Sequence, residues 1–202
     1  MLLCEDTRHT GKLLEKYREY QVGPKPKLLA YTDFNRGKRI PQVVALLKEG
    51  KDIGLVSNAG TPLISDPGYK LVREVIKLAE TNPDVGLTVL PGANAVLPAV
   101  LLSGLPPDRF YFAGFLPRKS FQRRKFLSDL PRTTIIAYES PRRLVRSLGD
   151  IKEVLGDIPV AICQEMTKLY ESVFRSTIGE AIQDFSKRDK IRGEIVLVLD
   201  NR

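Results

Sequence analysis

Cysteine, histidine and tryptophan are scarce in this chain: its 202 residues include two cysteines, one histidine and no tryptophan. Cys4 and Cys163 are too few to build a disulfide framework, and together with His9 they do not make a Cys/His zinc site. We therefore expect no metal centre. Such sparse cysteine use is typical of a reducing compartment, so the sequence predicts a cytoplasmic protein.

Long apolar runs are also missing. No stretch approaches the ~20 apolar residues that a membrane-spanning helix needs. The first six residues, Met1 to Asp6, contain neither a basic segment nor a long apolar segment, so no signal peptide is visible. A membrane protein is therefore not expected, and at roughly 100–200 residues per domain the length predicts one large or two small domains.

The charge that is present is unevenly distributed. Arginine and lysine exceed the acids by a net charge of +8 for the whole chain. The segment 118–146 holds nine basic residues against Asp129 and Glu139, which leaves +7 there. A localised basic stripe of this kind indicates a polyanionic partner such as nucleic acid, although a solvated helix face gives the same pattern.

Apolar periodicity predicts an α/β protein with a mostly parallel first half and a mixed sheet in the second half. We place a domain boundary at Pro91–Gly92, giving an N-terminal α/β domain (1–91) and a C-terminal mixed-sheet α/β domain (92–202). Pro41 suits the first turn of a helix, and 85–90 has a strand-like pattern. The chain begins almost directly in a helix, so the first domain lacks the strand that normally opens such a domain.

The segment from Ser57 to Gly68 is the richest candidate site. It follows a short apolar strand and precedes a helix, at the strand end where open α/β sheets bind ligands. Its glycines allow close backbone approach and its short polar side chains supply hydrogen bonds, but it lacks the Lys–Ser/Thr pair of a phosphate-binding loop. An ordinary strand-to-helix connection remains the alternative.

Three further segments lie at predicted strand ends. In the first, Asn94 follows a Pro-Gly turn and either contacts a ligand or caps the next helix. In the second, Glu139 is a general base, a ligand contact or the ion-pair partner of Arg142. In the third, Glu165 and Lys168 place a carboxylate and an amine together.

Several short motifs then occur together and in one order along almost the whole chain. They are Glu5-Asp6-Thr7-Arg8, the Ser57–Gly68 loop, Leu90-Pro91-Gly92, Ser103-Gly104-Leu105-Pro106, Gly114-Phe115-Leu116-Pro117-Arg118-Lys119, Tyr138-Glu139-Ser140-Pro141, Thr167-Lys168 and Gly193-Glu194. In this order they resemble the ribosomal RNA small subunit methyltransferase I family, one of the tetrapyrrole-methylase-like (class III) methyltransferases.

The resemblance implies two α/β domains with S-adenosylmethionine in the cleft between them, usually in a homodimer. It also implies 2′-O-methylation of a cytidine ribose in small-subunit (16S) ribosomal RNA. The residues it implies for cofactor binding are Asn58, Gly60, Thr61, Pro62, Asn94, Ala95, Tyr138, Glu139, Ser140, Gly193 and Glu194. The residues expected to bind RNA are Arg8, Arg118, Lys119, Arg123, Arg124, Arg142 and Arg143.

The chain departs from the family pattern at several positions. Asn58 stands where the family usually has Asp, Ala93–Asn94 where it has Pro–Ser, Arg142 where it has His, and Gln164 where it has Arg. The family also carries an opening strand and a glycine-rich loop of the G-T-P-I-G-N kind before the Glu5–Arg8 motif, and this sequence does not contain them.

For methyl transfer to a ribose hydroxyl, the candidates for a catalytic base are Glu139, Glu165 and Lys168. Lys168 fits that role if desolvation lowers its pKa, and otherwise it holds phosphate. Two other functions stay open at this point. One is a non-catalytic RNA-binding remnant, and the other is a small-molecule tetrapyrrole methylase, which does not need the basic stripe.

Overall fold

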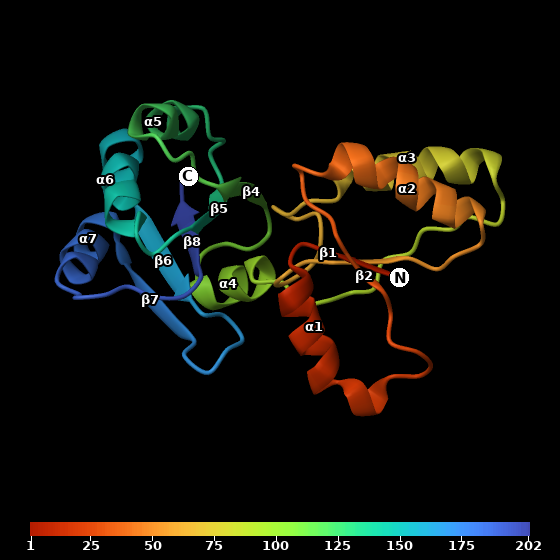
Figure 1. The fold of residues 1–202 in the computed structure, drawn as a ribbon. Helices are drawn as coiled ribbons and strands as arrows, with labels where there is room; N and C mark the ends of the chain where they lie inside the picture. The colour runs from red at the N-terminus through yellow and green to blue at the C-terminus, as the bar shows by residue number, and fades with distance from the viewer. The chain divides into compact units, whose positions relative to one another are not determined.

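The computed structural model describes residues 1–202 and divides them into two compact units, Met1–Ala93 and Asn94–Arg202. Figure 1 shows both units as ribbons. The division falls between residues 93 and 94, where the sequence predicted 91 and 92. Each unit is an α/β structure with its own sheet and its own buried core.

The first unit contains a three-stranded parallel sheet in the order β2-β1-β3. Its strands are β1 (Leu2–Cys4), β2 (Leu28–Ala30) and β3 (Gly54–Val56). Its helices are α1 (Thr7–Lys16), the short 3₁₀ helix η1 (Arg18–Tyr20), α2 (Arg36–Lys48) and α3 (Tyr69–Thr81). Within this unit, α2 and α3 lie on one side of the strands and α1 on the other (Figure 1).

Apolar spacing explains the core of this unit. Leu71, Val75 and Leu78 recur at helical spacing on α3 and are buried together with Leu3 of the central strand and Val43 of α2. The side chain of Asp6 accepts hydrogen bonds from the backbone N–H groups of Arg8 and His9, which caps the first turn of α1.

Three expectations for this unit are wrong. The unit does not open on a helix, because Leu2–Cys4 forms the middle strand and pairs on both sides. A strand of three residues is too short to show an alternation of apolar and polar side chains in the sequence. Residues 85–90 do not form a strand: Val85 is buried, but Val89 and Leu90 are 73% and 83% exposed and no ladder pairs them. Pro41 lies inside α2, which begins at Arg36.

The second unit contains a five-stranded mixed sheet in the order β4-β5-β8-β6-β7, with only the β4–β5 pair parallel. Its strands are β4 (Phe110–Phe115), β5 (Thr134–Glu139), β6 (Pro159–Gln164), β7 (Ser172–Thr177) and β8 (Ile195–Asp200). Its helices are α4 (Val96–Ser103), α5 (Ser120–Ser128), α6 (Leu144–Leu155) and α7 (Ile178–Ser186).

Both faces of this sheet are covered, and strand alternation sorts the side chains between them. On β6, Val160 and Ile162 pack in the cluster that contains the apolar residues of α5, α6 and α7. Ala161 and Cys163 point to the opposite face, where the cluster includes residues of α4. A strand buried on both faces reads as a continuous apolar run. For this reason the sequence predicts β6 with its observed bounds, Pro159–Gln164.

The predicted α/β class with two α/β domains is therefore confirmed. None of the seven α-helices has the length and apolar character needed to cross a bilayer.

Candidate functional site

The loop from Ser57 to Gly68 leaves the end of β3 and leads into α3. The Ser57 hydroxyl donates to the carbonyls of Ala59 and Gly60 (3.0 and 3.3 Å), which folds the chain into a tight turn. Gly60 has φ 70°, and a Cβ atom there would lie 3.4 Å from the Ala93 carbonyl oxygen. This left-handed backbone and the close approach both favour glycine.

A second contact holds this loop within the first unit. The Thr61 hydroxyl donates to the Ala93 carbonyl at 3.1 Å, which ties the 57–68 loop to the residues after the Pro91–Gly92 turn. Asn58 and Gly60 are exposed, and no ion pair or side-chain hydrogen bond occupies the Asn58 amide. The loop therefore presents one unpaired amide, that of Asn58, at a strand end.

Asn94 caps α4. Its side-chain Oδ1 accepts hydrogen bonds from the backbone N–H groups of Val96 (2.8 Å) and Leu97 (3.1 Å). These bonds satisfy two of the orphan donors at the helix start. Of the two roles that the sequence left open for Asn94, the structure shows the cap.

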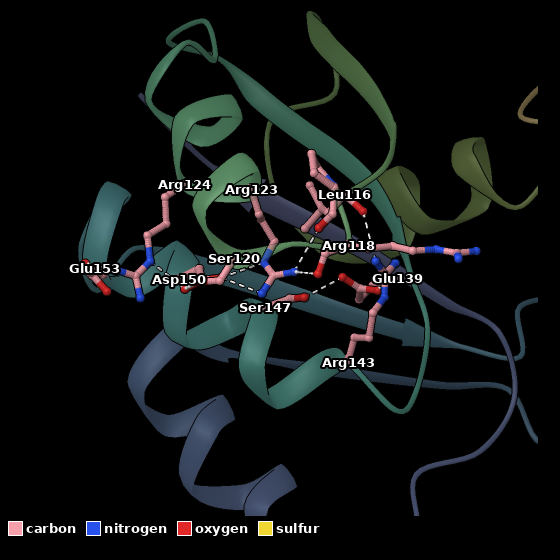
Figure 2. A network of polar contacts seen from close by, with 11 residues as sticks. Leu116, Arg118, Ser120, Arg123, Arg124, Glu139, Arg143, Ser147, Asp150 and Glu153 are labelled. Carbon is pink, nitrogen blue, oxygen red and sulfur yellow. Dashed lines mark hydrogen bonds and ion pairs between the residues drawn. The ribbon is translucent and has the colours of Figure 1, made fainter.

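Glu139, at the end of β5, lies in a buried polar network (Figure 2). Its carboxylate pairs with Arg143 at 2.6 Å and accepts from the Ser140 backbone N–H at 2.6 Å and the Ser147 hydroxyl at 2.5 Å. The Glu139 side chain is fully buried. The expected ion pair thus exists, but its partner is Arg143 and not Arg142, because the turn between β5 and α6 brings Arg143 back to the Glu139 carboxylate and leaves Arg142 exposed.

A second buried carboxylate organises α5 and α6. Asp150 pairs with Arg123 at 2.5 Å and with Arg124 at 2.8 Å, and it accepts from the Ser120 hydroxyl at 2.8 Å. Burial alone would raise the pKa of Asp150, but the hydrogen bonds from Arg124, Ser120 and Arg123 together outweigh burial and lower it. No sequence pattern singles out this residue, because Asp150 lies outside the basic stripe and far along the chain from its partners.

This arrangement contradicts the expected contact between Arg123 and RNA. Arg123 is 3% exposed and its guanidinium points into the protein, so it does not face solvent phosphates. The Arg143 side chain is also mostly bound within the protein, since it is 23% exposed and pairs with Glu139. Arg124 is half exposed and shared between Asp150 and Glu153.

Three other arginines and lysines expected to bind RNA are exposed and have no acidic partner: Arg118, Lys119 and Arg142. Arg8 lies in the first unit and is exposed, but it pairs with Asp6 at 2.8 Å. The hydrogen bonds from Arg8 hold the pKa of Asp6 well below its usual range.

Glu165, Lys168 and Glu194 form a compact charged group after β6. Lys168 lies 3.1 Å from a carboxylate oxygen of each glutamate, and Glu165 also accepts from the backbone N–H of Glu194 at 2.7 Å. Gly193 makes room, because a Cβ atom there would lie 2.5 Å from Cγ and Cδ of Glu165. The expected cofactor residues Gly193 and Glu194 therefore lie beside the expected base Glu165.

The pKa of Lys168 is shifted upward, which is the opposite direction to the shift expected of a lysine that acts as a base. Burial alone would lower it, but the hydrogen bonds to Glu165 and Glu194 outweigh burial and raise it. The pKa of Glu165 is lowered, chiefly by the backbone N–H of Glu194 and then by Lys168. A lysine with a raised pKa stays protonated at neutral pH, so the expectation of a desolvated Lys168 base is wrong.

The fold and these sites define the class of the protein. Residues 1–182 match the family model "Tetrapyrrole (Corrin/Porphyrin) Methylases". A solved structure with a similar fold is the uroporphyrin-III-C-methyltransferase from Thermus thermophilus, with TM-score 0.61 and 17% identity over 99% of this chain and 82% of that one. The chain is thus an α/β protein of the tetrapyrrole methylase class.

Curated relatives narrow the class. The "Ribosomal RNA small subunit methyltransferase I" of Thermotoga maritima is 43% identical over 100% of this chain and 86% of its own length. The relative of the same name from Hydrogenobaculum sp. is 41% identical over 98% of this chain and 83% of its own length. The chain belongs to the ribosomal RNA small subunit methyltransferase I family. The family and enzyme class predicted from the sequence are therefore confirmed.

Proposed function

We propose that this protein transfers a methyl group from S-adenosylmethionine to the 2′-hydroxyl of a cytidine in small-subunit ribosomal RNA, in the cytoplasm. The observation that carries the proposal is the identity of 43% and 41% to relatives named as small-subunit rRNA methyltransferases, which extends over nearly the whole chain. The exposed basic side chains that remain on the second unit agree with an RNA substrate.

The first unit has groups that suit such a cofactor. The exposed Asn58 amide offers a donor and an acceptor for a ligand that is bound by neutral polar contacts, and Gly60 is exposed beside it. We propose that Asn58, Gly60, Thr61 and Pro62 of the first unit contact S-adenosylmethionine. For the second unit, the family resemblance implies Asn94, Ala95, Tyr138, Ser140, Gly193 and Glu194 as cofactor residues. Glu139 is a poorer candidate, because three internal partners occupy its carboxylate.

When bound, S-adenosylmethionine supplies an activated methyl group, so the protein chiefly aligns the two reactants. The candidate bases of this chain agree with a protein that mainly aligns the reactants. Glu139 is buried and fully partnered, Lys168 is held protonated, and Glu165 is held ionised by its hydrogen bonds. None of the three is poised as a strong base, so we propose that positioning of the ribose hydroxyl provides most of the rate enhancement.

The RNA phosphates are proposed to contact the exposed basic residues of the second unit. Arg118, Lys119 and Arg142 have no acidic partner in the structure and are therefore available to phosphates. Each neutralised phosphate releases counterions, so binding is expected to weaken steeply as salt rises.

We further propose that the protein acts as a homodimer, which sedimentation equilibrium checks directly.

The test is a transfer assay with methyl-labelled S-adenosylmethionine. The purified protein is offered small ribosomal subunits, their isolated RNA, and a tetrapyrrole precursor in separate reactions. We expect label in the ribosomal RNA and none in the tetrapyrrole. Label only in the tetrapyrrole, or none in any acceptor, contradicts the proposed function.

Asn58→Ala provides a variant of the cofactor loop that removes an exposed amide with no structural partner. Calorimetric titration with S-adenosylmethionine is expected to show at least severalfold weaker binding than in the native protein. Unchanged binding contradicts the assignment of Asn58 to the cofactor, without bearing on the RNA substrate.

A further inference from the structure

The segment between β4 and α5, residues 116–119, carries two exposed cations but has little regular structure of its own. Its sequence is Leu116-Pro117-Arg118-Lys119. Pro117 has no backbone N–H, and the only strand-like bond is from the Leu116 N–H to the Tyr138 carbonyl at 3.4 Å. Regular secondary structure therefore leaves the middle of this segment, Pro117 and Arg118, without backbone partners.

Two guanidinium groups hold its carbonyls in succession. Arg143 donates to the Leu116 carbonyl at 3.2 Å, and Arg123 donates to the carbonyls of Pro117 and Arg118 at 2.9 and 3.3 Å. The backbone N–H of Arg123 donates to the next carbonyl, that of Lys119, at 2.9 Å. Four consecutive carbonyls therefore have a defined partner.

Each guanidinium is itself fixed by a buried carboxylate (Figure 2). Arg123 meets Asp150 through both Nε (2.8 Å) and Nη2 (2.5 Å), and Arg143 meets Glu139 at 2.6 Å. A planar fork bound in this way has little rotational freedom. Its remaining N–H groups therefore point in fixed directions, toward the 116–119 carbonyls.

The side chains of the same segment behave differently. Arg118 and Lys119 are exposed and have no acidic partner, and the Arg118 side chain extends away from the network (Figure 2). The segment thus joins a fixed backbone to free cationic side chains. A preorganised backbone lowers the ordering cost when such side chains bind an anion.

We propose that Arg123 and Arg143 are positioning residues, which hold residues 116–119 so that Arg118 and Lys119 meet consecutive phosphates of the RNA. This inference rests on the proposed function. It replaces the expectation that Arg123 touches RNA with an indirect role, and it assigns Asp150 and Glu139 as the anchors of the two arginines.

The informative variants are Arg123→Lys and Arg143→Lys, each made separately. Lysine keeps the positive charge and an ion pair with the carboxylate, but it lacks the fork that reaches the carbonyls. The control for an arginine bound to a carboxylate through two nitrogens is Arg188→Lys, in a more exposed ion pair than that of Arg123. Arg188 also meets a carboxylate through two nitrogens, those of Nε and Nη2 to Asp184 at 2.9 and 2.5 Å, and it does not contact residues 116–119.

Binding of a labelled oligocytidylate is measured as a function of salt, with Arg118→Ala/Lys119→Ala as the reference for lost phosphate contacts. That reference should lower the salt slope by about 1.4 and the affinity by about tenfold at physiological salt. We expect Arg123→Lys to reproduce most of the loss in salt slope and most of the loss in affinity. Combined with Arg118→Ala/Lys119→Ala, it should cause no further loss of either. Arg188→Lys should bind like the native protein. Native binding by Arg123→Lys and Arg143→Lys, or an additive loss, overturns the proposal.

Proteolysis separates this inference from the proposed function, since it needs no RNA. A backbone released from its guanidinium partners opens more often, so trypsin should cut after Arg118 and Lys119 about tenfold faster in Arg123→Lys than in Arg188→Lys. Equal cleavage rates overturn the positioning role. If the native protein binds no RNA while this difference is seen, the proposed function fails and the structural role of Arg123 stands.

Discussion

Arginines with similar sequence surroundings have different roles in this protein. Arg118 is free in solvent, whereas Arg123 is 3% exposed and bound to Asp150. The basic stripe predicted a polyanion contact for both, because charge counts do not tell which side chain turns inward. Asp150 decides that Arg123 turns inward. It is distant from Arg123 in the sequence and comes close to it only when α5 packs on α6.

Gly193 provides a test at this scale. It has φ 81°, and an added Cβ would collide with the Glu165 side chain, whereas Gly156 has φ 88° and open space around it. We expect Gly156→Ala to cost about 1–3 kcal/mol of stability from backbone strain alone. Gly193→Ala should cost more, because it also displaces Glu165 from Lys168. Urea unfolding of both variants measures the difference, and equal losses would show that the clash is relieved at no cost.

Cys163 gives a second test of a single residue. Its thiol is fully buried on β6, and burial raises its pKa to about 11. The thiolate is the reactive form, so native Cys163 should not react with Ellman's reagent at mildly alkaline pH. The buried Cys4 should also be protected. Both thiols should titrate after unfolding in guanidinium chloride, and rapid reaction of Cys163 in the native protein would contradict the assigned burial.

At the scale of elements, the sequence predicted the buried strands best. The run Pro159–Gln164 is apolar throughout because both of its faces are covered, and its bounds were predicted correctly. Residues 85–90 have a similar apolar character but pair with no strand. A strand depends on hydrogen bonds to a neighbour as much as on its own side chains, and no local pattern contains that neighbour.

The link between α5 and α6 predicts a pH dependence. The pKa of Asp150 is lowered in the folded protein, so its contribution to stability is present above its unfolded pKa of about 3.9 and is lost as the pH falls below it. Asp150→Asn leaves Arg123 buried without its counter-charge and should cost about 3–5 kcal/mol at neutral pH.

The corresponding measurement is urea unfolding from pH 7 to pH 3 for the native protein and for Asp150→Asn. The native protein should lose stability toward acid more steeply than the variant, because the variant lacks the Asp150 titration. Parallel curves for the two proteins would show that other carboxylates account for the acid sensitivity.

At the scale of the whole molecule, the order of short motifs predicted more than any single one of them. Each motif is modest alone, yet together they predicted the fold class and the family, which the family model and the curated relatives confirm. The roles of the individual site residues remain predictions. Side-chain partners such as Arg143 for Glu139 come from tertiary packing, which the order of motifs does not contain.

The central claim is methylation at the ribose of a cytidine, and nucleoside analysis tests it most directly. Small-subunit RNA that lacks the modification is incubated with the protein and S-adenosylmethionine, digested to nucleosides, and analysed by mass spectrometry. The account predicts that 2′-O-methylcytidine appears and grows with protein concentration. RNA that contains no new 2′-O-methylcytidine, or carries the methyl group only on a base, would contradict it.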